Sequence, residues 1–123
     1  MKILIPPSEG KAKVKPLDTL FKDTKFKFSK YTQQIVDLLC LIENEDLTSV
    51  YGTSQEKAIM FHRQNQDIFN SKCVPAITRY TGVVYNNIEW SSLSKKAQNY
   101  MDKHVLIFSG LFGLLTPDTL IPD

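Results

Sequence analysis

The stretch HVLIFSGLFGLLTPDTLIPD, residues 104–123, decides the fold class. Its first part, His104–Phe108, is apolar without alternation, which is typical of a strand covered on both faces. Ser109-Gly110 then predicts a turn, followed by one turn of helix before Pro117-Asp118. Because a doubly covered strand needs neighbouring strands and covering helices, this stretch indicates an α/β fold.

The rest of the chain alternates short apolar runs with helical patterns. Further strands are expected at Lys2–Ile5 and Cys73–Tyr80, with an edge strand at 25–28 and a short apolar segment at Val83–Tyr85. Helices are expected from Ser29, from a capping box at Thr53–Glu56 to about Asn70, and from Ser91 or Ser94 to about Lys103. This order predicts a mixed or mostly parallel sheet of few strands with helices packed on it.

One face of the first helix carries its apolar residues, which recur at helical spacing. These are Tyr31, Ile35, Leu38, Leu39 and Ile42. We expect this face to be the buried one.

The chain stops while its pattern is still apolar, and few strands are available to cover the one at His104–Phe108. We therefore expect residues 1–123 to form a single, incomplete domain. An incomplete domain would expose apolar residues around Leu111–Ile121 and could associate with a second copy through them. The alternative is a small complete domain whose C-terminus packs on itself.

Composition excludes several classes of protein. No apolar run approaches the ~20 residues of a membrane helix, and Pro6-Pro7 interrupts the N-terminal run too early for a secretory signal. We therefore expect a cytoplasmic protein with no membrane partner. Cys40 and Cys73 are isolated, and no histidine lies at metal-ligand spacing from either. We expect free thiols, no metal site and no cofactor.

The net charge of +2 conceals an asymmetry along the chain. Residues 1–30 carry eight lysines and three acids, whereas residues 31–123 carry seven basic residues and ten acids. A basic N-terminal third, with Lys11, Lys13 and Lys15 close together, favours a phosphate-rich partner. A solvated lysine-rich loop would have the same composition.

Two turns after predicted strands are candidates for anion binding. In the first, Ser8 and Lys11 flank Gly10 directly after a strand, where exposed amides and a lysine can meet a phosphate. In the second, Ser109-Gly110 follows the last strand, and Gly113 permits close backbone approach. If the two strands are parallel neighbours, Ser8 and Ser109 converge at one edge of the sheet. The alternatives are an ordinary turn with a solvated lysine and a tight packing turn.

Two further groups have residue types suited to nucleic acid. Arg79 can pair with phosphate and Tyr85 can stack on a base, on either side of Gly82. The expected third helix carries Lys95, Lys96 and Lys103. A core tyrosine, a surface arginine and a solvated helix face are the alternatives.

Three stretches match a known family in order and spacing. They are ILIPPSEGK at residues 3–11, AITRYTGVVYNNI at 76–88 and IFSGLFGLLTPDTLIPD at 107–123. The first is similar to a strand with a Pro-Pro-Ser-Glu-Gly-Lys turn, the second to an aromatic-Gly-Val-Tyr segment, and the third to a Ser-Gly-Leu-Tyr/Phe-Gly-Leu-Leu block with Pro and Asp after it. Together they resemble the YaaA family of bacterial peroxide-stress proteins and span the whole chain.

The resemblance implies protection from hydrogen peroxide, lowering of free iron and binding to DNA. It also implies that residues 1–123 are the N-terminal half of a roughly twofold longer protein. The helix-hairpin-helix element described for the family usually carries a Gly-apolar-Gly triplet. Here Gly110-Leu111-Phe112-Gly113 has one residue too many between its glycines. Iron binding by this half has little support, because no HExxH, EF-hand loop or carboxylate pair at i, i+4 is present.

The expected function is therefore a DNA-binding peroxide-stress protein whose contacts are largely electrostatic. The expected contact residues are Ser8, Lys11, Lys13, Lys15, Arg79, Tyr85, Lys95, Lys96, Lys103, Ser109, Gly110 and Gly113. The alternative is an enzyme acting on a nucleotide or damaged base in the crevice at the strand ends, with catalytic residues unknown. A third reading is an interaction module without chemistry.

Overall fold

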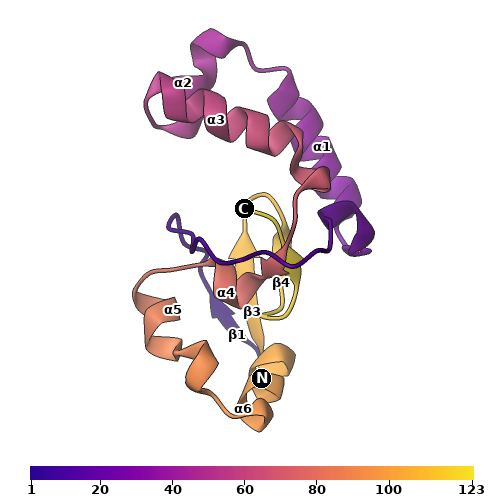
Figure 1. Cartoon of the computed structure of the whole chain (residues 1–123), viewed down its shortest axis with the longest axis vertical. Helices are drawn as coiled ribbons and strands as arrows, with labels where there is room; N and C mark the ends of the chain where they lie inside the picture. The colour runs from indigo at the N-terminus through magenta and orange to yellow at the C-terminus, as the bar shows by residue number, and fades with distance from the viewer.

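The computed structural model describes residues 1–123 and contains two small sheets with helices around them (Figure 1). The strands are β1 (Ile3–Ile5), β2 (Val74–Pro75), β3 (Val105–Ser109), β4 (Gly113–Leu115) and β5 (Leu120–Ile121). The α-helices are α1 (Ser29–Cys40), α2 (Leu47–Tyr51), α3 (Gln55–Gln66), α4 (Ala76–Arg79), α5 (Val83–Ile88) and α6 (Lys95–His104). Single 3-10 turns are η1 (Phe21–Asp23), η2 (Asn44–Asp46), η3 (Ile68–Asn70) and η4 (Trp90–Ser92). None of the helices combines the length and the apolar character needed to cross a membrane.

The larger sheet has the strand order β1-β3-β4. β1 pairs with β3 in parallel, with Ile3 opposite Val105, and β4 pairs with β3 in antiparallel fashion. The predicted α/β class with a mixed sheet is confirmed. The predicted strand at His104–Phe108 is also confirmed, one residue further along as β3.

The sheet is covered on one face, not on both as predicted. Val105 and Ile107 of β3 are buried, whereas Phe108 is 46% exposed. On β1, Leu4 is 57% exposed. Side chains of β3 therefore alternate between the buried and the outward face. The sequence does not show this alternation, because the outward residues are apolar too.

The chain after Ser109 forms a β-hairpin, and the expected turn of helix is wrong. Gly113 has φ +75°, a left-handed conformation that favours glycine and turns the chain back along β3. The Ser109 hydroxyl accepts a hydrogen bond from the Phe112 N–H at 3.1 Å, which closes the turn. The Gly110–Gly113 stretch is thus the β3–β4 connection.

The expected strand at Cys73–Tyr80 is only two residues long. β2 pairs with β5, and the chain then enters α4, whose first N–H groups bond to the 117–119 turn: Ala76 to the Thr119 carbonyl and Ile77 to the Pro117 carbonyl. A turn distant in sequence thus supplies the partners that a longer strand would have needed. The segment from Val83 is the helix α5, and residues 25–28 form a turn with Lys25 at φ +52° rather than an edge strand.

The helix ends and faces agree only in part with the sequence patterns. Ser94 caps α6 by accepting a hydrogen bond from the Ala97 N–H at 3.3 Å, which confirms one of the two predicted starts. α1 buries Thr32 and Val36 most deeply, whereas the predicted apolar face is divided: Ile35, Leu39 and Ile42 are half-buried, and Tyr31 and Leu38 are exposed. The capping box does not form, because Ser54 is the N-cap of α3 and its side chain makes no capping bond.

Two helical regions lie at opposite ends of the molecule, with the sheets between them. α1, α2 and α3 form the upper region in Figure 1, and α5 and α6 form the lower one beside the N-terminus. The core between them includes an aromatic cluster in which the Phe21 ring lies 5.2 Å from Phe26, 5.3 Å from Phe69 and 5.5 Å from Phe112.

Because only one face of β3 is covered, two adjacent substitutions in this strand should differ greatly in their effect on stability. Ile107→Ala should lower the free energy of unfolding by about 2–5 kcal/mol, because it leaves a cavity in the core. Phe108→Ala should change it by about 1 kcal/mol or less, because that ring is already half exposed. Urea unfolding measures both, and equal losses would show that both faces of the sheet are covered.

Candidate nucleic-acid interface

A strap, residues 11–21, runs antiparallel along residues 71–80 and is held there by backbone hydrogen bonds. The Ala12 N–H donates to the Arg79 carbonyl at 2.7 Å, and the Leu17 N–H donates to the Cys73 carbonyl at 2.9 Å. The Phe21 N–H donates to the Ser71 carbonyl at 2.9 Å. Figure 1 shows this part of the chain crossing the middle of the molecule. The strap therefore has an ordered backbone although it contains little regular structure.

Lys11, Lys13 and Lys15 are exposed at alternate positions of the strap, and the intervening Ala12 is half-buried. In an extended chain, residues two apart are separated by about 6.6 Å, so the three lysines form a regularly spaced row. None of them is in an ion pair. The ion pairs of the chain are Lys72–Asp18 at 2.8 Å and Arg79–Asp123 at 3.8 Å.

Arg79 is not on the surface but beneath the strap. Its side chain is 4% exposed, and its Nη1 donates to the Ala12 carbonyl at 3.0 Å. Because its own carbonyl accepts from the Ala12 N–H, Arg79 holds both polar backbone groups of one strap residue. The guanidinium does not face solvent, so its contacts position the strap rather than reach a phosphate directly.

The Ser8 turn packs against the loop between α4 and α5. The Ser8 hydroxyl donates to the Gly10 carbonyl at 2.9 Å, and that carbonyl also accepts the Thr81 N–H at 3.1 Å. A Cβ on Gly10 would lie 2.5 Å from Thr81 Oγ1, so any larger residue at this position would force the Thr81 side chain or the loop to shift. Gly82 has φ +113°, which also favours glycine. The turn thus places Lys11 at the start of the strap.

Two tyrosines connect the ends of β1 and β3. The Tyr85 hydroxyl donates to the Pro6 carbonyl at 2.6 Å, and its ring lies 5.4 Å from that of Tyr80. Burial raises the pKa of Tyr85 to about 12, with Tyr80 adding to the shift. Burial also raises the pKa of Tyr80, while a hydrogen bond with the Ser109 side chain acts in the opposite direction.

At the strand ends, where Ser8 and Ser109 were predicted to converge, the structure has a contact between buried side chains. The parallel pairing of β1 and β3 brings the Ser8 turn and Ser109 to one edge of the sheet. Tyr85 is buried there and presents no free ring face for a base. Gly113 forms part of the turn of the β3–β4 hairpin. A Cβ on Gly110 would meet no atom within 4 Å, so no close backbone approach requires glycine at that position.

The lysines of α6 lie at the other end of the same strand. Lys95, Lys96 and Lys103 are exposed, but Lys103 comes just before β3, whereas Ser109 ends it. The Lys2 ammonium donates to the Lys103 carbonyl, which fixes this helix end beside the N-terminus. The structure therefore does not join the helix lysines and the strap lysines into one surface.

Comparison with known proteins identifies the family. The model of the family described as Peroxide stress protein YaaA matches residues 1–123. The chain belongs to the YaaA family. It is 32% identical over 96 residues to a UPF0246 protein of Rickettsia conorii, covering 77% of this chain and 39% of that protein. It is 30% identical over 118 residues to a UPF0246 protein of Streptococcus pneumoniae, covering 94% of this chain and 46% of that protein. The chain thus spans less than half the length of these curated relatives.

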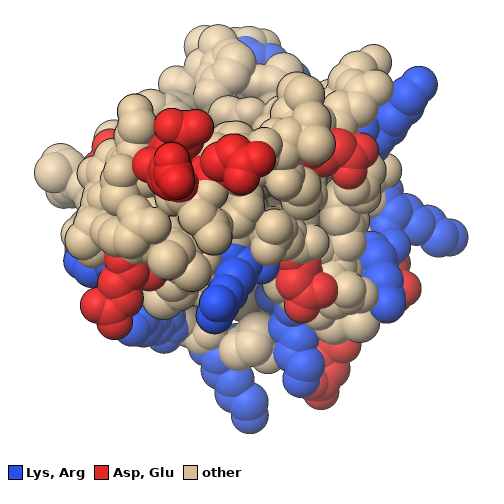
Figure 2. Space-filling model, turned by 90° about the horizontal axis from the view of Figure 1, so that it is seen from above, with Lys and Arg blue, Asp and Glu red and all other residues tan.

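A second group of basic residues in this YaaA-family chain was missed by the sequence analysis. Lys25 and Lys27 alternate with Phe26 and Phe28, and both lysines line a cavity. The Lys-Phe-Lys-Phe sequence was the available signal, since basic residues interleaved with aromatic ones are typical of single-strand binding. Figure 2 shows acidic side chains gathered on part of the upper face, whereas most basic side chains project from its lower and right-hand rim.

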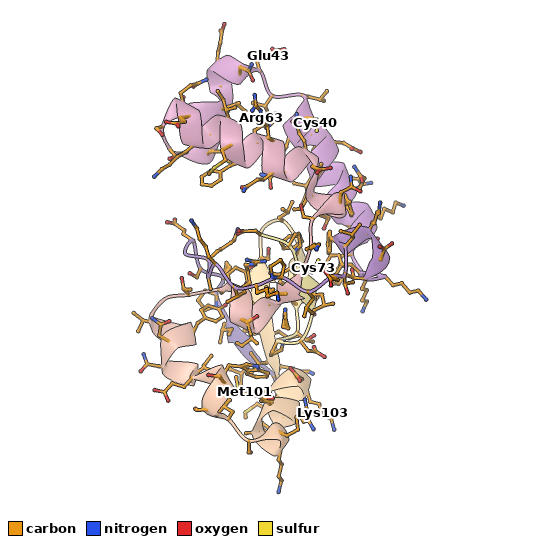
Figure 3. All side chains as sticks on the ribbon, viewed as in Figure 1. Cys40, Glu43, Arg63, Cys73, Met101 and Lys103 are labelled. Carbon is orange, nitrogen blue, oxygen red and sulfur yellow. The ribbon has the colours of Figure 1, made fainter.

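The cysteines of this YaaA-family chain differ in exposure. Cys40 is exposed at the end of α1, whereas Cys73 is buried in the middle of the molecule (Figure 3). Burial raises the pKa of the Cys73 thiol to about 11, although the charge of Arg79 acts in the opposite direction. No group of three or more His, Cys, Asp or Glu side chains is placed to hold a metal ion.

The contact between the Ser8 turn and Thr81 predicts a large difference between two glycines. Gly10→Ala should lower the free energy of unfolding by about 1–3 kcal/mol, because its Cβ would overlap Thr81 Oγ1. Gly110→Ala should leave stability unchanged or raise it by up to about 1 kcal/mol, because its site is open and its φ is not positive. Thermal and urea unfolding measure both, and a harmless Gly10→Ala would contradict the close packing of the two loops.

The two thiols should react at very different rates. At pH 8 a thiol with a pKa of about 11 is ionised about 100-fold less than one of ordinary pKa. A disulfide reagent such as DTNB should therefore titrate one thiol rapidly in the folded chain and two in urea. Cys40→Ser should remove the rapid phase. A rapid phase of two thiols in the folded wild type would show that Cys73 is accessible.

Proposed function

We propose that this chain acts in the peroxide-stress role of its family by binding DNA along the strap. The observation that carries the proposal is the row of Lys11, Lys13 and Lys15, exposed and without acidic partners. Contacts between lysine and phosphate depend little on the base sequence of the DNA. The proposed binding is therefore largely electrostatic and weakens as the salt concentration rises.

The fixed backbone of the strap supports this proposal on energetic grounds. A flexible lysine tail has to be ordered when it binds, and ordering reduces the affinity. Here the hydrogen bonds from Ala12, Leu17 and Phe21 order the strap before any ligand arrives. Arg79 contributes by holding Ala12 between Lys11 and Lys13.

The geometry favours binding over catalysis at the strand ends. The Tyr85 hydroxyl is bonded to the Pro6 carbonyl, and the Ser109 hydroxyl accepts from the Phe112 N–H. Ser8 is likewise bonded to the Gly10 carbonyl. Each hydroxyl proposed for an enzyme crevice thus has a structural partner, and we assign these residues to holding the turns at the strand ends rather than to chemistry.

Two further parts of the proposal concern location and assembly. We place the protein in the cytoplasm, where DNA is accessible. Self-association through the C-terminal segment would have to use its few uncovered residues. Leu115 and Ile121 are fully buried within the chain, whereas Leu114 is 40% exposed.

The proposal predicts that three lysines control DNA affinity and its salt dependence. Replacing Lys11, Lys13 and Lys15 together by Gln should lower the slope of log K against log salt by about 2–3 for duplex DNA, because each phosphate contact contributes about 0.9. Fluorescence anisotropy of a labelled duplex across a salt series measures the slope.

The matched control replaces Lys95, Lys96 and Lys103 by Gln, which removes the same charge from the far end of β3. This variant should retain most of the wild-type slope. Equal losses in the two triple variants would attribute binding to net charge, and an unchanged slope in the strap variant would overturn the proposal.

A further inference from the structure

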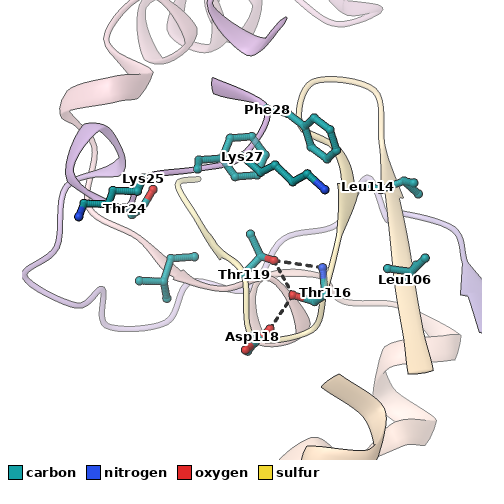
Figure 4. A pocket seen from close by; sticks show the side chains of 11 residues that line it. Thr24, Lys25, Lys27, Phe28, Leu106, Leu114, Thr116, Asp118 and Thr119 are labelled. Atoms are coloured by element: carbon teal, nitrogen blue, oxygen red, sulfur yellow. Dashed lines mark hydrogen bonds between the residues drawn. The ribbon is translucent and has the colours of Figure 1, made fainter. Parts of the chain in front are cut away.

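A cavity of about 630 Å³ lies between the 24–28 turn and the outward face of the β3–β4 hairpin (Figure 4). Its volume is in the range of small-molecule sites. The strap ends three residues before Thr24, the first residue that lines the cavity. The strap and the lining of the cavity are thus adjacent in the sequence, with only the η1 turn between them.

The cavity has an apolar wall that the chain leaves uncovered. Leu106 and Leu114 come from the outward face of the sheet, and Phe28 and Leu120 also line the cavity. A second cavity of about 430 Å³ shares Phe28 and Leu114 with the first. The half-buried Phe28 ring thus has apolar space on more than one side.

Cationic groups line the same cavity and have no acidic partner. Figure 4 shows Lys27 extended toward Phe28 and Leu114, with Lys25 on the opposite side of the cavity. The Lys27 ammonium lies 5.5 Å from the centroid of the Phe28 ring. Neither lysine is in an ion pair. A ligand with a negative charge beside a flat apolar group would satisfy both features.

Polar groups gather at the base of the cavity. The Thr116 hydroxyl donates to Asp118 Oδ1 at 2.6 Å and lies 2.7 Å from the Thr119 hydroxyl. The Thr116 N–H donates to the Thr119 hydroxyl at 3.0 Å. The second oxygen of the Asp118 carboxylate has no such partner in this network, and it can accept a hydrogen bond from an exocyclic amino group.

We infer that this cavity binds one unpaired nucleotide of DNA. The base lies against Phe28 and the leucines, its polar edge meets Thr116, Asp118 and Thr119, and its phosphate meets Lys25 and Lys27. This inference rests on the proposed DNA binding and adds a preference for unpaired over fully paired DNA. A second copy of the chain fits less well, because it would bring the same lysines to the interface with only Asp118 among the lining residues to oppose them.

The test uses a single-stranded oligonucleotide and the matching duplex, each with one 2-aminopurine. Phe28→Leu should weaken single-strand binding by about 5- to 100-fold, because it removes the stacking ring but keeps an apolar side chain. It should leave duplex binding by the strap unchanged. The fluorescence change of 2-aminopurine on binding the wild type should be lost in this variant.

Two further variants keep the test informative if Phe28→Leu folds poorly. Lys27→Gln changes an exposed residue and should lower the single-strand salt slope by about 0.7. Phe61→Leu, on the exposed side of α3, is the control and should change neither affinity nor fluorescence. Urea unfolding of each variant confirms that it is folded.

Each outcome bears on a different claim. Equal loss of single-strand and duplex binding in Phe28→Leu, or 2-aminopurine fluorescence that is the same in wild type and variant, would overturn the nucleotide site but leave strap binding intact. Failure of the wild type to bind either DNA would overturn the proposed function itself. A dimer that Leu114→Lys dissociates would show that a second copy fills the cavity and would also overturn the inference.

Discussion

The parallel pairing of β1 with β3 is the constraint on which the rest of the structure depends. Two parallel strands cannot be joined by a tight turn, so the chain between Ile5 and Val105 has to return to the starting end of the sheet. α6 makes the final part of that return and ends beside the N-terminus. The exits of both strands then lie at one edge, where Tyr85 and Tyr80 link the Pro6 carbonyl to the surroundings of Ser109. The strap begins at this edge, so its position follows from the strand pairing.

The elements that the sequence predicted well are those whose signals are local. The apolar run at β3 and the capping serine of α6 need no distant partner to be recognised. The strand expected at Cys73–Tyr80 failed because its partners are distant: β5 covers only two residues, and the 117–119 turn bonds to the next N–H groups. The hairpin after Ser109 was missed because Gly113 at positive φ, rather than a helical pattern, determines the direction of the chain.

The residue types of the candidate interface could be predicted from the sequence, but which of them lie together on the surface could not. The lysines of the strap are evident in the sequence, whereas the hydrogen bonds that order their backbone come from residues fifty or more positions away. Arg79 and Tyr85 carry suitable chemistry for nucleic acid, yet both are buried and hold other segments in place. Residue type alone cannot separate a positioning arginine from a contacting one, because the difference lies in burial. The sequence also does not show how far the α6 lysines lie from the strap lysines. Only the topology shows that the two groups are at opposite ends of β3.

The distribution of charge favours the strap over the upper helical region for the proposed DNA track. The acidic residues between α1 and α2, Glu43, Glu45 and Asp46, are exposed in the upper helical region. The strap and the 24–28 turn carry unpaired lysines. A polyanion is repelled by the first surface and attracted by the second, and each surface acts on the DNA close to it, because charges are screened beyond the Debye length of about 8 Å at physiological salt. On the proposed track, DNA that extends from the strap to the 24–28 turn would meet Lys25 and Lys27. The inferred nucleotide site at Phe28 lies beside these two lysines, so the charges that would hold the DNA backbone adjoin an apolar surface on which a base could lie.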